Sequence, residues 1–306
     1  MNFDFADVLI EVMERGASDL HITAGVPPMV RERGNLSALD FPALDPQDTR
    51  EIVYSILTND QRKRLENDWQ IDLSYSIPGR ARFRVNAYFQ RAAIGAAFRL
   101  IPSEMPQLEQ LALPPVLEDF TKRPRGLVLV TGPTGSGKST TLAAMIDRIN
   151  RTRHEHIMTV EDPIEFLHPH RSCIVNQREV GGDAISFAMA LKAALRQDPD
   201  VILVGEMRDL ETIETALTAA ETGHLVFATL HTQDTAQTVD RIVDVFAPQQ
   251  QHQVRMQLSI ALQGIITQQL LPTADGRGRV CAAEILVPTP AVRNLIREGK
   301  THQIYS

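Results

Sequence analysis

The chain has 306 residues, of which 43% are hydrophobic and 23% charged, and its formal net charge is −7. These values exclude a disordered or low-complexity chain and predict a soluble globular protein long enough for two domains. The acidic balance argues against nucleic acid as the main partner, because proteins dedicated to binding nucleic acid are usually basic.

Cysteine usage and hydropathy exclude further classes. The two cysteines, Cys173 and Cys281, lie far apart, so neither a zinc ribbon nor a disulfide framework is expected. The first 16 residues carry acidic side chains and do not resemble a signal peptide. No apolar stretch approaches the ~20 residues needed to span a bilayer. We therefore expect a cytoplasmic protein that reaches a membrane through a partner or through its surface.

The first hundred residues are expected to mix short helices and strands. Apolar residues at helical spacing predict a helix that starts near Phe5 and stops at Gly16, and two short strands follow. A second helix is expected from about Pro46. Residues 71–77 and 83–89 each alternate apolar and polar side chains, a pattern typical of a hairpin with one apolar face.

The opposite face of this hairpin is polar. A third strand is expected over residues 94–100, and with the hairpin it presents Arg82, Arg84, Asn86 and Arg99 on one side. A solvated face is the simpler interpretation of this pattern. The alternative is an arginine face presented to an anion.

A change in composition marks the predicted domain boundary. Residues 101–115 contain four prolines, and we assign residues 1–102 to a first domain, 103–115 to a linker and 116–306 to a second domain. Strands and helices alternate after the linker, which predicts an α/β fold with a mainly parallel sheet covered by helices. A long helix from about Pro248 to Gln268, and then a hairpin, are expected near the end.

The segment GPTGSGKST, residues 132–140, fits the phosphate-loop pattern G-x-x-x-x-G-K-[ST] between an apolar strand and an amphipathic helix. Its glycines let the backbone curl so that N–H groups and the positive end of the helix dipole face phosphate oxygens. Lys138 is expected to reach the β- and γ-phosphates of ATP, and the Ser139 hydroxyl to ligate Mg²⁺. The predicted nucleotide-binding residues are Thr134, Gly135, Ser136, Gly137, Lys138, Ser139 and Thr140.

Carboxylates follow two of the predicted strands. Glu206 comes after the apolar run 201–204, and Glu161, Asp162 and Glu165 follow another strand. Ligands of open α/β sheets bind at the carboxyl ends of the strands, so these side chains are expected near the phosphates. There they could hold the water shell of Mg²⁺, with Glu206 as a metal ligand either directly or through water, or activate water. The alternatives are a surface residue at a helix start for Glu206 and a plain acidic loop for the others.

Two histidines flank the predicted strand HLVFATLH. His231 falls at the carboxyl end of this strand and His224 at its start. A histidine that senses the γ-phosphate is one interpretation, and a structural histidine is the other.

Taken together and in order, these motifs resemble the secretion ATPase superfamily (GspE/PilT family), which powers type IV pili and type II secretion. The segments that carry the resemblance are the phosphate loop, TVEDPIE at 159–165, DPDVILVGEMRD at 198–209 and TGHLVFATLHT at 222–232.

Within the superfamily the chain is most similar to the PilT-type retraction ATPases. SDLHITAGVPP at 18–28 and ARFRVNAY at 81–88 resemble their N-terminal domain, and no tetracysteine module is present. AVRNLIRE at 291–298 matches their C-terminal motif, with Val292 in place of isoleucine. The resemblance implies hydrolysis of Mg-ATP to drive retraction of type IV pili, the basis of twitching motility.

The resemblance also implies a PAS-like N-terminal domain and a RecA-like P-loop NTPase domain in a homohexamer. Arg84 and Arg99 match arginines that contact phosphate, and Arg82 is a weaker candidate. The remaining matches are Glu165 with the catalytic glutamate, Glu206 with the Walker B glutamate, and His224 and His231 with the histidine box.

The implied partners are a platform protein of the inner membrane and a paralogous retraction ATPase, with no nucleic acid. The implied location is the inner face of the cytoplasmic membrane. Three alternatives remain open: a pilus-assembly or secretion ATPase, a RecA-like nucleic-acid translocase, and a nucleotide-gated interaction module with negligible turnover.

Overall fold

A computed structural model describes the chain over residues 4–77, 80–101, 105–275 and 278–305. The chain divides into two compact units, Met1–Ser103 and Glu104–Ser306, and each is described by itself. Residues 102 and 103, where the sequence predicts the first domain to end, lie outside the described residues. In the described part of the chain, no helix is both long and apolar enough to cross a lipid bilayer.

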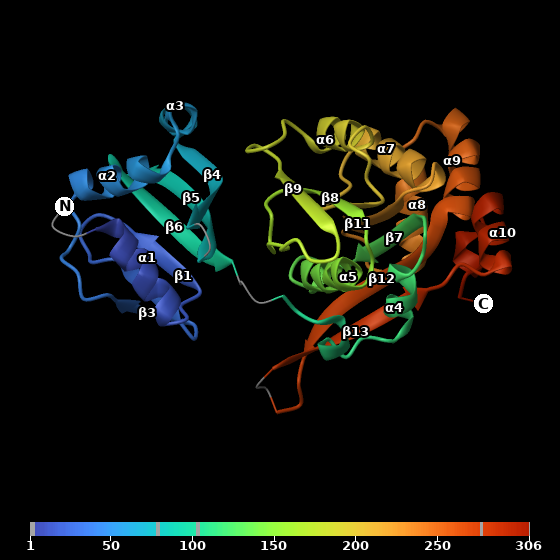
Figure 1. Ribbon diagram of the computed structural model, residues 1–306, viewed down its shortest axis with the longest axis horizontal. Coiled ribbons are helices and arrows are strands. Elements are labelled where there is room, and N and C mark those ends of the chain that lie inside the picture. The colour runs from blue at the N-terminus through green and yellow to red at the C-terminus, as the bar shows by residue number, and fades with distance from the viewer. Residues whose placement is uncertain (1–3, 78–79, 102–104, 276–277, 306) are drawn as a thin grey trace. The chain divides into compact units, whose positions relative to one another are not determined.

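The first unit is a sheet with helices on one face (Figure 1). Its antiparallel strands have the order β3-β2-β1-β6-β5-β4. The strands are β1 (Asp19–Ile22), β2 (Met29–Glu32), β3 (Asn35–Ala38), β4 (Gln70–Ile77), β5 (Ala81–Gln90) and β6 (Ala93–Ile101). The helices are α1 (Phe5–Glu14), α2 (Pro46–Ile56) and α3 (Asn59–Asp68).

Local sequence signals fix these helices, and one was not predicted. Asp45 caps α2 in a reciprocal pair with Asp48, and Pro46 occupies the first turn, where its missing N–H costs nothing. The unpredicted helix α3 begins at the same kind of capping box, formed by Thr58 and Gln61. Only one of its residues, Leu65, is buried, so the helix lacks the apolar stripe that would have indicated it.

The second unit is built on a mixed sheet of order β13-β12-β7-β11-β10-β8-β9. Strands β12 and β13 pair antiparallel, and the other pairings are parallel, as the sequence predicts. The strands are β7 (Gly126–Thr131), β8 (His156–Glu161), β9 (Ile174–Glu179), β10 (Val201–Val204), β11 (Leu225–Leu230), β12 (Leu262–Pro272) and β13 (Arg279–Leu286).

Helices cover both faces of this sheet (Figure 1). One apolar cluster packs α6 (Phe187–Ala194), α7 (Leu210–Glu221), α8 (Thr235–Asp244), α9 (Pro248–Ala261) and α10 (Pro290–Glu298) against one face. A second cluster packs α4 (Val116–Thr121) and α5 (Lys138–Thr152) against the other. The short helices are η1 (Leu108–Gln110) and η2 (Thr301–Gln303). Because Leu108 is buried in the second cluster, the later part of the predicted linker packs on the second unit.

The prediction of one helix from Pro248 to Gln268 was wrong. Helix α9 ends at Ala261, and β12 begins at the next residue. Leu262, Ile265 and Ile266 are fully buried beside β7, where the sheet needs a further strand. At Gly264 the ring of Phe120 occupies the space of a side chain, and this close packing outweighs any local preference for helix.

The order of the strands brings the chemistry together. Strand β11 lies between β7 and β10, and β8 follows on the far side of β10. These strands are parallel, so the segments after their carboxyl ends emerge at one edge of the sheet. The carboxyl ends of these strands carry predicted site residues, which are the phosphate loop after β7, the carboxylates at the end of β8 and beyond it, Glu206 after β10 and His231 after β11.

Candidate functional site

The phosphate loop connects β7 to α5, and its backbone requires glycine. Gly132, Gly135 and Gly137 have φ angles of 135°, 78° and 90°, which side chains rarely adopt. At Gly132 an added β-carbon would also overlap the carbonyl oxygen of Gln268 on β12. Gly137 caps α5, so the first turn of that helix opens into the loop.

Lys138 is buried at the start of α5. Its Nζ atom donates to the carbonyl oxygens of Gly132, at 2.9 Å, and Pro133, at 3.0 Å. Burial lowers the pKa of the ammonium group, and the charges of Glu206 and Glu165 oppose this shift. The lysine therefore sits inside the loop, close enough to both carboxylates to feel their fields.

The other predicted nucleotide-binding residues line the same turn. Thr134 and Gly135 are exposed, Ser139 and Thr140 are partly exposed, and Ser136 is buried. In the described part of the structure, the buried Ser136 hydroxyl has no hydrogen-bond partner. A loop with backbone N–H groups, one lysine and unengaged hydroxyls fits a polyphosphate chain.

Glu206 contacts two side chains immediately after β10, those of Arg208 and His231. Its Oε2 atom lies 2.6 Å from an Nη atom of Arg208, and its Oε1 atom lies 3.1 Å from Nε2 of His231. Burial alone would raise the pKa of this carboxyl group, but the two partners outweigh burial and lower it. Arg208 also feels the negative charge of Asp162.

The carboxylates at the end of β8 and in the loop that follows differ sharply in environment. Glu161 is enclosed, and its Oε1 atom accepts hydrogen bonds from Thr159 Oγ1, at 2.7 Å, and from Gln177 Nε2, at 3.1 Å. Burial raises the pKa of Glu161 in spite of these bonds. Asp162 and Glu165 are exposed. Only Glu165 among these three is both accessible and sensed by Lys138.

The two histidines lie at opposite ends of strand β11. His231 contacts Glu206 at the phosphate-loop edge. His224 precedes the same strand, its carbonyl oxygen accepts from Gly126 N, and its Nδ1 atom lies 3.0 Å from the carbonyl oxygen of Ala219. The six residues of β11 separate the two histidines by ~20 Å at the usual rise per residue. The structure thus brings His231 to the loop and places His224 far from it.

The predicted arginines share one exposed face of the first unit. Arg84 on β5 pairs directly with Arg99 on β6, and Arg99 in turn pairs with Asp19 on β1. The Nε atom of Arg99 lies 2.9 Å from Asp19 Oδ1. Arg82 lies two residues before Arg84 on the same face and is partly exposed. Among the described residues Arg84 has no ion-pair partner, and its contact with phosphate stays a prediction.

Sequence reasoning assigned no role to three residues that shape this site. Arg208 stands in a quoted motif, and its spacing of two from Glu206 was the signal available. Gln177 bonds Glu161, and Gln268 donates from Nε2 to Thr141 Oγ1 at 2.8 Å, which ties β12 to α5. Neither glutamine is marked by any pattern in the sequence.

The carboxylates at this site could supply only some of the ligands of a magnesium ion. No three His, Cys, Asp or Glu side chains converge on a metal position within the described residues. Both oxygens of Glu206 are engaged by Arg208 and His231. This carboxylate would therefore reach a metal through water, while Ser139 could bind directly. Magnesium held by one hydroxyl, water and phosphate oxygens is typical of nucleotide sites.

A cavity of about 480 Å³ opens beside the loop. Pro133 of the loop, Gln268 of β12 and Glu284 of β13 contribute to its lining. The Oε1 atom of Gln268 is buried there and, within the described residues, has no hydrogen-bond partner. The cavity adjoins the phosphate loop and belongs to the same site.

Comparison with known proteins agrees with this geometry. The family model described as "Type II/IV secretion system protein" matches residues 4–277. A Pseudomonas aeruginosa protein named "Type IV pilus retractation ATPase PilT" is 54% identical over 303 residues, covering 99% of this chain and 88% of that protein. A Neisseria gonorrhoeae protein named "Twitching motility protein" is 53% identical, covering 91% of this chain and 75% of that protein.

A solved structure extends the likeness to three dimensions. The crystal structure of the pilus retraction motor PilT with bound ADP matches with a TM-score of 0.94 and 55% identity. The match covers 99% of this chain and 89% of that one.

Proposed function

The chain belongs to the Type II/IV secretion system protein family, and we propose that it is an ATP-hydrolysing motor that drives retraction of type IV pili. The observation that carries this proposal is the 54% identity, over 99% of the chain, to a protein named as a pilus retraction ATPase. The phosphate loop, with Lys138, Glu206 and Glu165 acting on one another, supplies the chemistry that such a motor requires.

The second unit is, in this proposal, a RecA-like ATPase domain and the first a PAS-like domain. A strand inserted between the phosphate-loop strand and the strand before Glu206 supports the RecA-like assignment, because β11 occupies that position. The helices on one face of an antiparallel sheet support the PAS-like assignment. The domain limits remain 1–102 and 116–306 with a linker over 103–115.

Phosphate binding and activation of water fall to different groups. Lys138 and the backbone N–H groups of the loop hold the β- and γ-phosphates. Glu165 orients or deprotonates the attacking water, because it is exposed and lies within the field of Lys138. Glu161 is a poorer base at this position, since it is enclosed and shares its carboxylate with Thr159 and Gln177. We assign Glu161 a structural role, because its hydrogen bonds join β8 to β9.

His231 and Glu206 link the two strands that follow the phosphate-loop strand in the order of the sheet, β11 and β10. Their 3.1 Å contact joins the ends of β10 and β11 beside the position of the γ-phosphate. Loss of that phosphate would change the charge that both side chains feel. Mg²⁺, bound by Ser139 and, through water, by Glu206, would neutralise negative charge on the β- and γ-phosphates.

Arg84 and Arg99 are proposed to meet the γ-phosphate when the first unit closes on a nucleotide. Arginine contacts of this kind are worth about 10³–10⁵ in rate. Release of phosphate would remove the anion that holds these guanidinium groups, and the units would separate. A change of this kind between two rigid parts is a common switching movement. His224 lies far from the loop of its own chain, so a role in hydrolysis would require the loop of a neighbouring subunit.

The proposed assembly is a homohexamer at the inner face of the cytoplasmic membrane. Its proposed partners are a platform protein in that membrane and a paralogous retraction ATPase. We expect no nucleic-acid partner, because the chain carries a net negative charge.

Two measurements test the proposal. Purified protein should release phosphate from Mg-ATP, and Lys138→Ala should abolish both turnover and binding of a fluorescent ADP analogue. In cells, deletion of the gene should give excess pili and no twitching, and the parent sequence but not Lys138→Ala should restore motility. Full turnover by the lysine variant would refute the site, and loss of pili on deletion would refute retraction.

A secretion or assembly ATPase is the main rival, and deletion leading to bald cells would favour it. A nucleic-acid translocase is a second rival, and stimulation of turnover by single-stranded DNA would favour that. A nucleotide-gated module would bind nucleotide without steady-state turnover.

A further inference from the structure

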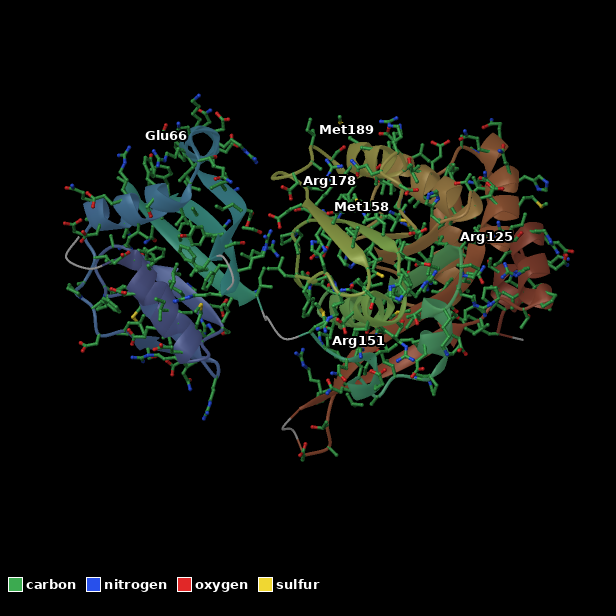
Figure 2. All side chains as sticks on the ribbon, viewed as in Figure 1. Glu66, Arg125, Arg151, Met158, Arg178 and Met189 are labelled. Atoms are coloured by element: carbon green, nitrogen blue, oxygen red, sulfur yellow. The ribbon has the colours of Figure 1, made fainter. Side chains whose placement is uncertain are left out.

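We infer that Gln177 and Glu179 are positioning residues that hold the loop after β8 so that Glu165 faces the nucleotide. This inference rests on the proposed function, because it assigns a task toward ATP hydrolysis to two residues outside the recognised motifs. Both side chains lie on β9, which the sequence did not predict as a strand. Figure 2 labels Met158 on β8 and Arg178 on β9, the paired strands from which the loop is held.

The contacts of Glu179 and Gln177 fall on either side of Glu165. Glu179 Oε2 accepts a hydrogen bond from the backbone N–H of Ile164 at 2.9 Å. Gln177 Nε2 donates to the carbonyl oxygen of Phe166 at 2.8 Å. The residues immediately before and after the glutamate are therefore fixed through their main chains, and the Glu165 side chain remains exposed.

Both polar atoms of the Gln177 amide form hydrogen bonds. Besides Phe166 and Glu161, which accept from Nε2, the Gln177 Oε1 atom accepts from the backbone N–H of His168 at 2.7 Å. One side chain thus joins two points of the loop to the enclosed carboxylate of Glu161. The alternation of a strand places residues 177 and 179 on one face of β9, so both side chains reach the main chain of the loop from the same face.

This arrangement solves a specific physical problem. A water-activating carboxylate must be exposed to reach its substrate, and an exposed loop is usually mobile. A displacement of about 1 Å in a reacting group can cost about 10²-fold in rate. Anchoring the backbone on both sides of Glu165 limits such displacement without covering the carboxylate.

The test is a set of variants in the full chain. Gln177→Leu removes all three bonds of the amide and should lower kcat for ATP at least tenfold, while KM and the affinity for a fluorescent ADP analogue stay within twofold. Glu179→Leu should act likewise, and Glu179→Gln should recover most of the rate because its amide oxygen still accepts from Ile164. Gln177→Glu keeps the acceptor for His168 but loses both donated bonds, so its rate should resemble that of Gln177→Leu.

Two control variants on the same strand separate positioning from folding. Asn176→Leu removes a neighbouring amide that contacts His156 instead of the loop. Val175→Ala weakens the core beneath β9 and keeps the main-chain N–H of residue 175, which donates to His170 in the loop. Both should keep kcat within twofold of the parent at temperatures below their own unfolding transitions.

Hydrogen exchange supplies a readout that does not need turnover. Backbone amides of residue 162 and of residues 164–168 should exchange about tenfold faster in Gln177→Leu than in the parent or in Asn176→Leu. A parent chain without ATP turnover would refute the proposed function, and the exchange rates would still decide whether the loop is anchored. Parent-like exchange and parent-like kcat in Gln177→Leu would overturn the inference, as would an equal loss of kcat in Val175→Ala.

Discussion

The buried imidazole of His168 should make the stability of the second unit depend on pH. This residue lies in the loop after β8, with 8% of its surface exposed. Burial lowers the pKa of the imidazole from 6.5 to about 4, although the charge of Asp147 opposes the shift. In the unfolded chain the same group returns to its ordinary value.

The sign follows from proton binding. Between pH 6.5 and about 4 the unfolded chain binds a proton at this position that the folded chain does not, so stability falls as pH falls through this window. At about 1.4 kcal/mol per pKa unit the full effect is about 3 kcal/mol, of which about 2 kcal/mol is reached at pH 5. His168→Leu removes the titrating group and should remove this loss.

Urea denaturation at pH 8 and pH 5 provides the assay. Far-UV circular dichroism follows both units, whereas fluorescence of Trp69, the single tryptophan, reports only on the first unit. The fall in unfolding free energy from pH 8 to pH 5 should be about 2 kcal/mol smaller in His168→Leu than in the parent, and the Trp69 signal should not change. His252→Leu, an exposed position, is the control. An equal fall in parent and His168→Leu would refute the reasoning.

Further predictions concern catalysis and the phosphate loop. Arg84→Ala should lower kcat for ATP by about 10³-fold, whereas Arg31→Ala on the same face should not, and equal rates for the two variants in a phosphate-release assay would contradict the role of Arg84. Glu206→Gln should lower kcat by about 10²-fold, and a parent-like rate would show that its charge is dispensable. Gly132→Ala should destabilise the chain by about 3 kcal/mol or more, because the added methyl group overlaps β12. Gly135→Ala should destabilise it by about 1 kcal/mol, from backbone strain alone. Thermal denaturation compares the two variants, and equal losses of stability would argue against the overlap.

The sequence predicted those parts of the fold that depend on local patterns. The alternation of β5 and β6 was enough to place Arg84 and Arg99 on one face, because the period of two in a strand leaves no other arrangement. The phosphate loop was recognisable because its pattern lies within one short segment, where the positive φ angles of its glycines are a local requirement.

The parts that were missed depend on contacts between distant segments. The change from α9 to β12 at residue 262 is set by pairing with β7. Because β7 is distant in the sequence, the residues around position 262 do not reveal this pairing. The sequence separates His231 from His224 by the end of the strand on which each lies, but it does not reveal the contact of His231 with Glu206, which follows β10. Gln177 bonds main-chain atoms, which leave no mark on the side-chain pattern.

The direct pairing of Arg84 with Arg99 has a practical consequence for handling the protein. Across neighbouring strands, the row that contains Arg84, Arg99, Asp19 and Arg31 holds three guanidinium groups and one carboxylate. Like charges opposite one another repel, and dissolved ions screen that repulsion. The first unit should therefore tolerate heat better in concentrated salt than in dilute buffer, and sulfate should protect it more than chloride because one divalent anion can bridge two cations.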